Sequence, residues 1–257
     1  WVYGGLPDNA MDLNDRDPGV YKTVIDGENL RRCVVGATNA TMEGFHIIRG
    51  EAAQGGGVLC ESDSTTFRNC TFVDNNATGT GTSGLGGAVY ANSSTSIFEA
   101  CLFEANSSEN EGGAVYANTS GLTIKRSQFY SNTAQVEAGA VFVNDSATTF
   151  SNCIFSRNDA GATKAAALFI TGSTVGPNLY HCTIGDHPEV PVKLQSAAGT
   201  TTIMNCILWD PDNDEITQTA STAPVITYTC IEQGFSGTGN ITVDPLFYNE
   251  AELDYRL

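Results

Sequence analysis

Charged side chains that could cleave a polysaccharide recur along the chain at intervals of one repeat. They are Glu43, Arg68, Glu99 and Lys125. An arginine or lysine beside carboxylates can act as the base of an elimination, and two facing carboxylates can hydrolyse a glycoside. The signs of these four charges alternate, however, as they do in ion pairs between neighbouring strands, which are each worth about 1 kcal/mol or less at a surface. We therefore favour a structural role for this row and predict no catalytic residue.

Nucleophilic and metal-dependent chemistry have less support. His46, His181 and His187 have no serine or cysteine partner at a recognisable spacing. Residues 210–215 place carboxylates at alternate positions, as in a short Ca²⁺ loop, but lack the glycine and the distal glutamate of an EF-hand. We expect no cofactor and no metal site.

Composition excludes further classes. The 257 residues contain 12 Lys plus Arg against 29 Asp plus Glu, a net charge of −17, so nucleic acid is not expected as a partner and no basic groove is evident. The longest unbroken apolar runs, such as 165–170, are far too short to cross a bilayer, so we expect no membrane insertion by this segment. Gly, Asn, Ser and Thr separate the apolar clusters, which indicates many short strands joined by turns.

Two short motifs alternate and define one repeat. The first is Cys-x-Phe followed by an Asn turn, with Cys70, Cys101, Ser127 and Cys153 as its clearest first residues. The second is Gly-Gly-Ala-Val-aromatic, as at 86–90 and 112–116. Steps of 24 to 31 residues between copies predict a parallel β-solenoid of eight or more coils that forms one domain over 1–257.

The repeat predicts which side chains face inward, because alternate residues of a strand share a face. A buried ladder of stacked thiols is expected, with the members Cys70, Cys101, Cys153, Cys182, Cys206 and Cys230. Their spacing disfavours zinc, and their strand register disfavours disulfides. Cys33 and Cys60 lie on neighbouring coils outside this ladder and are the most plausible disulfide. The recurring asparagines, such as Asn75 and Asn106, are expected to bond from coil to coil.

The same alternation places an aromatic stripe on the outside, formed by Tyr90, Tyr116, Phe142 and Phe169. This stripe could stack against sugar rings or receive a partner chain. Alternatively, a loop covers it, or the inward and outward faces are reversed. The sequence leaves these alternatives open.

The paired Gly-Gly-Ala-Val and Phe-x-x-Asn motifs between Gly55 and Asn158 resemble polymorphic outer membrane protein repeats, within the pectate-lyase-like right-handed β-helix superfamily. The resemblance implies a right-handed all-β helix in a secreted or surface-attached protein with an adhesive or structural role. It implies no specific reaction.

These observations favour a non-enzymatic extracellular module that is structural or adhesive. Its partners would be surface proteins, glycans or further copies of itself, because exposed end coils can template pairing with other chains, and such contacts build filaments head to tail. The chain is alternatively a segment of a longer surface protein. The competing function is a carbohydrate-active enzyme of the polysaccharide lyase kind, or a glycan-binding module with the aromatic stripe as its subsites.

Overall fold

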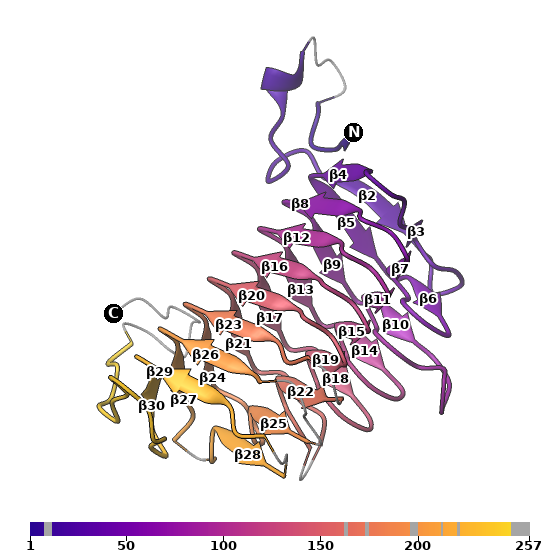
Figure 1. The fold of residues 1–257 in the computed structure, drawn as a ribbon. Helices are drawn as coiled ribbons and strands as arrows, with labels where there is room; N and C mark the ends of the chain where they lie inside the picture. The colour runs from indigo at the N-terminus through magenta and orange to yellow at the C-terminus, as the bar shows by residue number, and fades with distance from the viewer. Residues whose placement is uncertain are drawn as a thin grey trace.

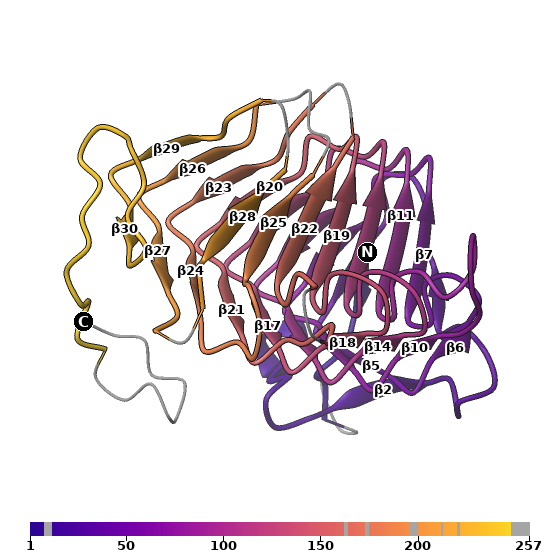
Figure 2. The same ribbon diagram turned by 90° about the horizontal axis from the view of Figure 1, so that it is seen from below.

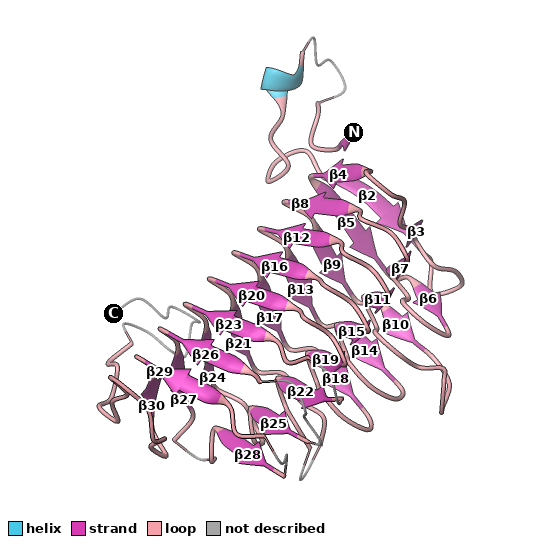
Figure 3. Ribbon diagram, viewed as in Figure 1, coloured by secondary structure: helices cyan, strands magenta, loops and turns pink. Residues whose placement is uncertain are grey.

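The chain forms a parallel β-solenoid of about eight turns, as predicted (Figure 1). The computed structural model describes residues 1–7, 12–161, 164–172, 175–195, 200–211, 213–219 and 222–247. Within these ranges the only helical element is the 3-10 turn η1 (Leu13–Asp15), beside the N-terminus in Figure 3. None of the described residues forms a helix with the length and apolar character that a membrane span requires.

Four parallel sheets run along the solenoid, and each turn contributes up to one strand to each of them. Sheet A contains β1 (Val2–Tyr3), β4 (Thr41–Glu43), β8 (Thr66–Arg68), β12 (Ile97–Glu99), β16 (Thr123–Lys125), β20 (Thr149–Ser151), β23 (Asn178–Tyr180), β26 (Thr202–Met204) and β29 (Val225–Thr227). Sheet B contains β2 (Thr23–Asp26), β5 (Phe45–Ile48), β9 (Thr71–Val73), β13 (Leu102–Glu104), β17 (Gln128–Tyr130), β21 (Ile154–Ser156), β24 (Thr183–Gly185), β27 (Ile207–Trp209) and β30 (Cys230–Ile231).

The other two sheets complete each turn, and their strands lie side by side in Figure 2. Sheet C contains β3 (Val34–Val35), β7 (Val58–Glu61), β11 (Val89–Asn92), β15 (Val115–Asn118), β19 (Val141–Asn144), β22 (Leu168–Thr171), β25 (Val192–Leu194) and β28 (Ile216–Gln218). Sheet D contains β6 (Glu51–Ala52), β10 (Asn76–Ala77), β14 (Ser107–Ser108) and β18 (Thr133–Ala134).

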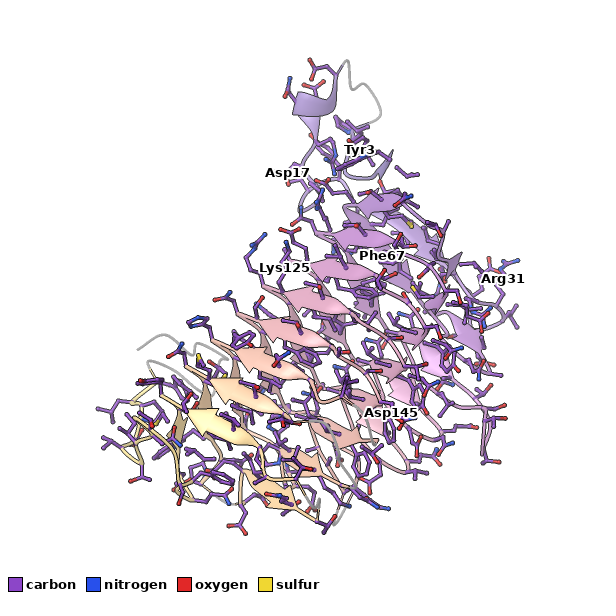
Figure 4. The ribbon with its side chains drawn as sticks, viewed as in Figure 1. Tyr3, Asp17, Arg31, Phe67, Lys125 and Asp145 are labelled. Atoms are coloured by element: carbon purple, nitrogen blue, oxygen red, sulfur yellow. The ribbon has the colours of Figure 1, made fainter. Side chains whose placement is uncertain are left out.

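In the core, similar apolar side chains stack from turn to turn. In sheet B the rings of Phe72, Phe103, Phe129 and Phe155 follow one another at centroid distances of 4.6 to 4.7 Å and interplanar angles of 3° to 6°. The rings of Phe67 and Phe98 from sheet A face them (Figure 4 labels Phe67), and the valines of sheet C close the core. The predicted inward and outward faces are therefore correct.

The turns between sheets depend on residues in the left-handed conformation. At the corner between sheets B and D, Asp74, Ala105, Ser131 and Arg157 each have φ between 51° and 54°. Each is followed by a buried asparagine: Asn75, Asn106, Asn132 and Asn158. The predicted asparagine ladder is thus located at a corner, where the chain changes direction.

The asparagine side chains form hydrogen bonds from turn to turn at this corner. The backbone N–H of Asn106 donates to Oδ1 of Asn132 at 3.1 Å, and Nδ2 of Asn106 donates to the same oxygen at 2.9 Å. Nδ2 of Asn132 donates to the carbonyl oxygen of Phe103 at 2.9 Å and to Oδ1 of Asn158 at 2.9 Å. Because no water reaches these groups, each would be costly to leave unpaired.

The cysteine ladder serves the corner between sheets A and B in the same manner. The N–H of Cys101 donates to Oγ of Ser127 at 3.1 Å, and the N–H of Cys182 donates to Sγ of Cys206 at 3.3 Å. Burial raises the pKa of the Cys101 thiol well above its ordinary value, so this thiol stays protonated. The ladder is structural.

The prediction that Cys230 belongs to this ladder is wrong. Cys230 pairs with Ile207 rather than with Cys206, because the last turn is one residue shorter than the motif suggests. Thr229 occupies the ladder position instead, and its Oγ1 accepts the N–H of Cys206 at 3.4 Å. Cys230 was assigned to the ladder because it is a cysteine. Threonine can accept the same hydrogen bond, so the residue type did not identify the position.

The predicted disulfide between Cys33 and Cys60 is also absent, and both thiols are free. Val34 pairs with Val58, so Cys33 lies beside Gly57, three residues before Cys60. Three residues of strand span about 10 Å, beyond the reach of a disulfide. Burial and the nearby Asp26 raise the pKa of Cys33 to about 11.

We predict that Asn132→Ala lowers the free energy of unfolding by about 3 kcal/mol, because it removes four hydrogen bonds and leaves a buried N–H unpaired. Denaturant unfolding followed by circular dichroism measures this. The matched control is Asn118→Ala in the same turn, because the Asn118 amide bonds to the side chains of Asn92, Asn144 and Thr119 at a half-exposed position. A loss of less than about 1 kcal/mol is expected for the control, and equal losses in the two variants would contradict the role of the ladder.

Candidate functional site: a groove at the corner of sheets A and B

The aromatic stripe is aligned as predicted. Tyr90, Tyr116, Phe142 and Phe169 pair in register across β11, β15, β19 and β22, and their rings stack at centroid distances of 4.9 to 5.5 Å. Their backbone faces outward, since the alternating residues Val89 and Ala91 are fully buried in the core. The stack is continuous over four turns.

The stripe is nevertheless not an exposed binding surface. Tyr90, Phe142 and Phe169 are only 5 to 8% exposed, and Ala138 and Ala165 pack over the rings of Phe142 and Phe169. These alanines belong to the segments that lead into sheet C, so the chain covers its own stripe. Burial, together with Glu111 and Tyr90, raises the pKa of Tyr116 to about 12. Of the alternatives that the sequence left open, a covering loop is correct.

The charged row on sheet A is aligned as predicted and internally paired. Glu43 pairs with Arg68, Arg68 with Glu99, and Glu99 with Lys125 in the strand register. The Glu99 carboxylate lies 3.2 Å from Arg68 Nε and 3.3 Å from Lys125 Nζ, and it also accepts a bond from Arg126. Partial burial acts to raise the pKa of Glu99, but the bonds from Lys125 and Arg68 outweigh it and lower the pKa. The carboxylate is therefore ionised and matched to three cations.

A groove of about 620 Å³ lies beside this row, along the corner between sheets A and B. Thr71, Leu102 and Gln128 from three consecutive turns line it from sheet B. Arg16, Pro18 and Gly19 close one end, from the N-terminal segment that projects beyond the stack in Figure 1. The groove is open and spans several turns.

Hydrogen bonds fix the closed end of the groove. Arg16 Nε donates to the carbonyl oxygen of Gly4 at 2.9 Å, and its Nη1 lies 3.1 Å from the Glu43 carboxylate. His46 Nδ1 lies 2.6 Å from the Thr71 hydroxyl. The guanidinium of Arg16 also lies 4.8 Å from the ring centre of Tyr3. Through Glu43, Arg16 thus ties the N-terminal segment to β4.

The groove is locally basic, contrary to the expectation from composition. Arg16, Arg126 and Glu43 line it, a net charge of +1 in a chain of net charge −17, and Arg68, Lys125 and Glu99 lie beside it on sheet A. The strand alignment identified Arg68 and Lys125. It missed Arg16, which lies in a non-repeated loop, and Arg126, which occupies a corner position that the motif does not mark.

In the acidic segment 210–215, where no metal site was expected, Asp212 lies outside the described residues. Asp210 Oδ2 accepts the N–H of His187 at 2.9 Å, and Glu215 Oε2 accepts the N–H of Gln233 at 3.0 Å. The two carboxylates therefore bond to backbone groups of neighbouring turns. No cluster of three His, Cys, Asp or Glu suited to a metal occurs in the described part of the chain.

His187 continues the asparagine ladder with a group that can titrate. Its side chain is fully buried, Nε2 lies 3.5 Å from Nδ2 of Asn158, and Nδ1 has no hydrogen-bond partner. Burial lowers the pKa of His187 to about 3 and raises the pKa of the adjacent Asp210 to about 6. Burial also raises the pKa of the neighbouring Glu215.

Comparison with known proteins shows the family. The family model described as "Right handed beta helix region" matches residues 31–175 and 112–242, which together span most of the chain. The chain belongs to this right-handed β-helix family, in agreement with the parallel sheets described above. No curated protein matches the chain significantly.

We predict that His187→Asn stabilises the protein increasingly as the pH falls. Below pH 6.5 the unfolded chain protonates this histidine, whereas the fold holds it neutral down to about pH 3, so the wild type loses stability across that window. The variant escapes a loss of about 2 kcal/mol at pH 5. Asp210 acts in the opposite direction between pH 6 and 3.8 in both proteins, because its pKa is raised in the fold.

Urea unfolding at pH 7.5 and pH 5 measures this difference. His181→Asn is the control, since His181 is exposed at a left-handed corner where Asn152 and Asn205 already stand in other turns. A gain in the His187 variant that is the same at both pH values would refute the titration argument.

Proposed function

We propose that the chain is a non-enzymatic, structural or adhesive β-helix module of a secreted or surface-attached protein. The observation that carries this proposal is the pairing of the charged row: the residues best suited to act as a base, Arg68 and Lys125, both bond to Glu99. An arginine or lysine held in an ion pair is stabilised in its protonated form and is a poor base.

The interior supports the same proposal. Ladders of phenylalanine, asparagine and cysteine run through successive turns with few interruptions, which favours a rigid rod. Such a rod can hold two other segments apart, or present binding surfaces at its ends and on its faces. The resemblance of its repeats to those of polymorphic outer membrane proteins agrees with display at a cell surface.

A second candidate function, glycan binding, is favoured by the groove at the corner of sheets A and B. Its rim offers the Arg126 guanidinium and the Gln128 amide as donors, and Leu102 and Pro18 supply apolar contacts. Planar polar groups beside small apolar surfaces suit sugar rings. This candidate replaces the aromatic stripe with the groove as the site of recognition.

We expect no turnover when the protein is incubated with a panel of neutral and acidic polysaccharides, measured by reducing ends and by absorbance of unsaturated products. Turnover that disappears in Arg68→Ala or Lys125→Ala would overturn the non-enzymatic proposal.

For the groove, we expect the double variant Arg126→Ala/Gln128→Ala to weaken retention of a bound glycan at least tenfold on an array. This follows because the variant removes two solvent-exposed donors at the rim. Arg157→Ala, an ion-paired arginine on a different corner, is the control. Equal retention in all three proteins would exclude the groove as the glycan site.

A further inference from the structure

The groove at the corner of sheets A and B is blocked at one end because the first turn has a much longer corner than the later turns. Each later corner between these two sheets takes one or two residues, such as Gly44 between β4 and β5. In the first turn, residues 4–22 stand between β1 and β2. Residues 16–19 of this long corner fold back over the next corner and line the groove. Figure 4 shows Asp17 and Lys125 on the same side of the stack.

Pro18 forms the block and packs tightly between two glycines. A Cβ atom on Gly5 would lie 2.7 Å from Cα of Pro18, and a Cβ atom on Gly44 would lie 2.8 Å from its Cγ. Both glycines are in the left-handed conformation, with φ of 80° and 78°. The N–H of Asp17 donates to the carbonyl oxygen of Gly5 at 2.7 Å, and His46 Nε2 lies 3.5 Å from the carbonyl oxygen of Pro18. The blocked end is therefore part of the packed fold.

From this end the groove extends over three turns. Thr71, Leu102 and Gln128 line it from sheet B and pair in register on β9, β13 and β17. Neighbouring strands lie about 4.8 Å apart, so these three residues span about 10 Å. The volume of about 620 Å³ is typical of a pocket that encloses a small ligand. The groove therefore holds a few sugar units and not a long stretch of a polysaccharide.

An internal unit of a polysaccharide does not fit at the blocked end. Its chain continues on both sides, and on one side it would collide with Pro18 and Arg16. A terminal unit carries a free hydroxyl group where an internal unit carries a glycosidic bond, so no chain follows it. The Arg16 guanidinium, the Glu43 carboxylate and the Thr71 hydroxyl line this end and can bond to sugar hydroxyl groups. The collision alone discriminates between the two kinds of unit.

We propose that the groove recognises the terminal unit of a glycan chain, which enters from the side of Gln128 and stops against Pro18. The proposal rests on the second candidate function, glycan binding, and adds to it that the chain binds by its end. Residues 16–19 then determine the specificity of the site.

Competition between long and short chains of the same polysaccharide tests this proposal. The probes are xylan, mannan, dextran and polygalacturonate, each as the polymer and as oligomers from partial hydrolysis that are still longer than the groove. The protein is retained on the immobilised polymer, and soluble polymer or oligomers are added as competitors. A site for chain ends responds to the molar concentration of ends, so at equal mass oligomers that are tenfold shorter should compete about tenfold better.

Two variants fill the blocked end with a large side chain. Gly19→Trp changes an exposed loop position and Thr71→Trp an outward position of β9, and each should weaken retention by about tenfold or more. Thr183→Trp is the control, at the equivalent outward position of β24 and outside the lining of the groove, and it should be retained as the wild type is. Circular dichroism shows that each variant is folded.

The outcomes separate this proposal from glycan binding as such. Equal inhibition by polymer and oligomers at equal mass overturns the recognition of a chain end, while weaker retention of Arg126→Ala/Gln128→Ala still supports a glycan site in the groove. Unchanged retention of both Gly19→Trp and Thr71→Trp also overturns the proposal, because the blocked end is then not occupied. Absence of retention on every probe overturns both the proposal and the glycan-binding candidate.

Discussion

The backbone N–H group that follows each left-handed corner is the constraint on which this solenoid depends. A turn must change direction between sheets, and it does so through residues such as Asp74, Ala105 and Ser131, which are not glycines. The N–H of the next residue is then bonded by an inward side chain of the following turn. Because these groups are sealed from water, each turn requires the next one to supply an acceptor, and the fold is stable only as a stack.

This constraint explains why three chemically different ladders serve the same purpose. Asparagine lies at one corner, serine at a second, where Ser94 N–H donates to Ser120 Oγ, and cysteine at a third. What the corner requires is a small inward side chain with an acceptor atom. Thiol chemistry is incidental, and for this reason Ser127 and Thr229 stand in the cysteine ladder without disturbing it.

The fold could be predicted from the sequence because the repeat fixes both the period and the faces. The outward row of Glu43, Arg68 and Glu99 and the stacked phenylalanines follow directly from strand alternation. The errors arose where the sequence pattern does not show how residues pack in three dimensions. Cys230 was misplaced because a hydroxyl replaced a thiol, and the aromatic stripe was taken as a possible surface because strand alternation cannot show that Ala138 and Ala165 fold over it.

The groove was not predicted, for a related reason. The same reason indicates where a functional site can arise in such a chain. A perfect repeat would place the same residue on every rung, so each outward row would consist of one residue type. A site with several kinds of contact must come from departures from the repeat: Leu102 and Gln128 where Thr71 stands in an earlier turn, Arg126 at a corner, and Arg16 from outside the solenoid. The ladders stabilise the rod, and because they are satisfied internally, the outward positions are free to vary.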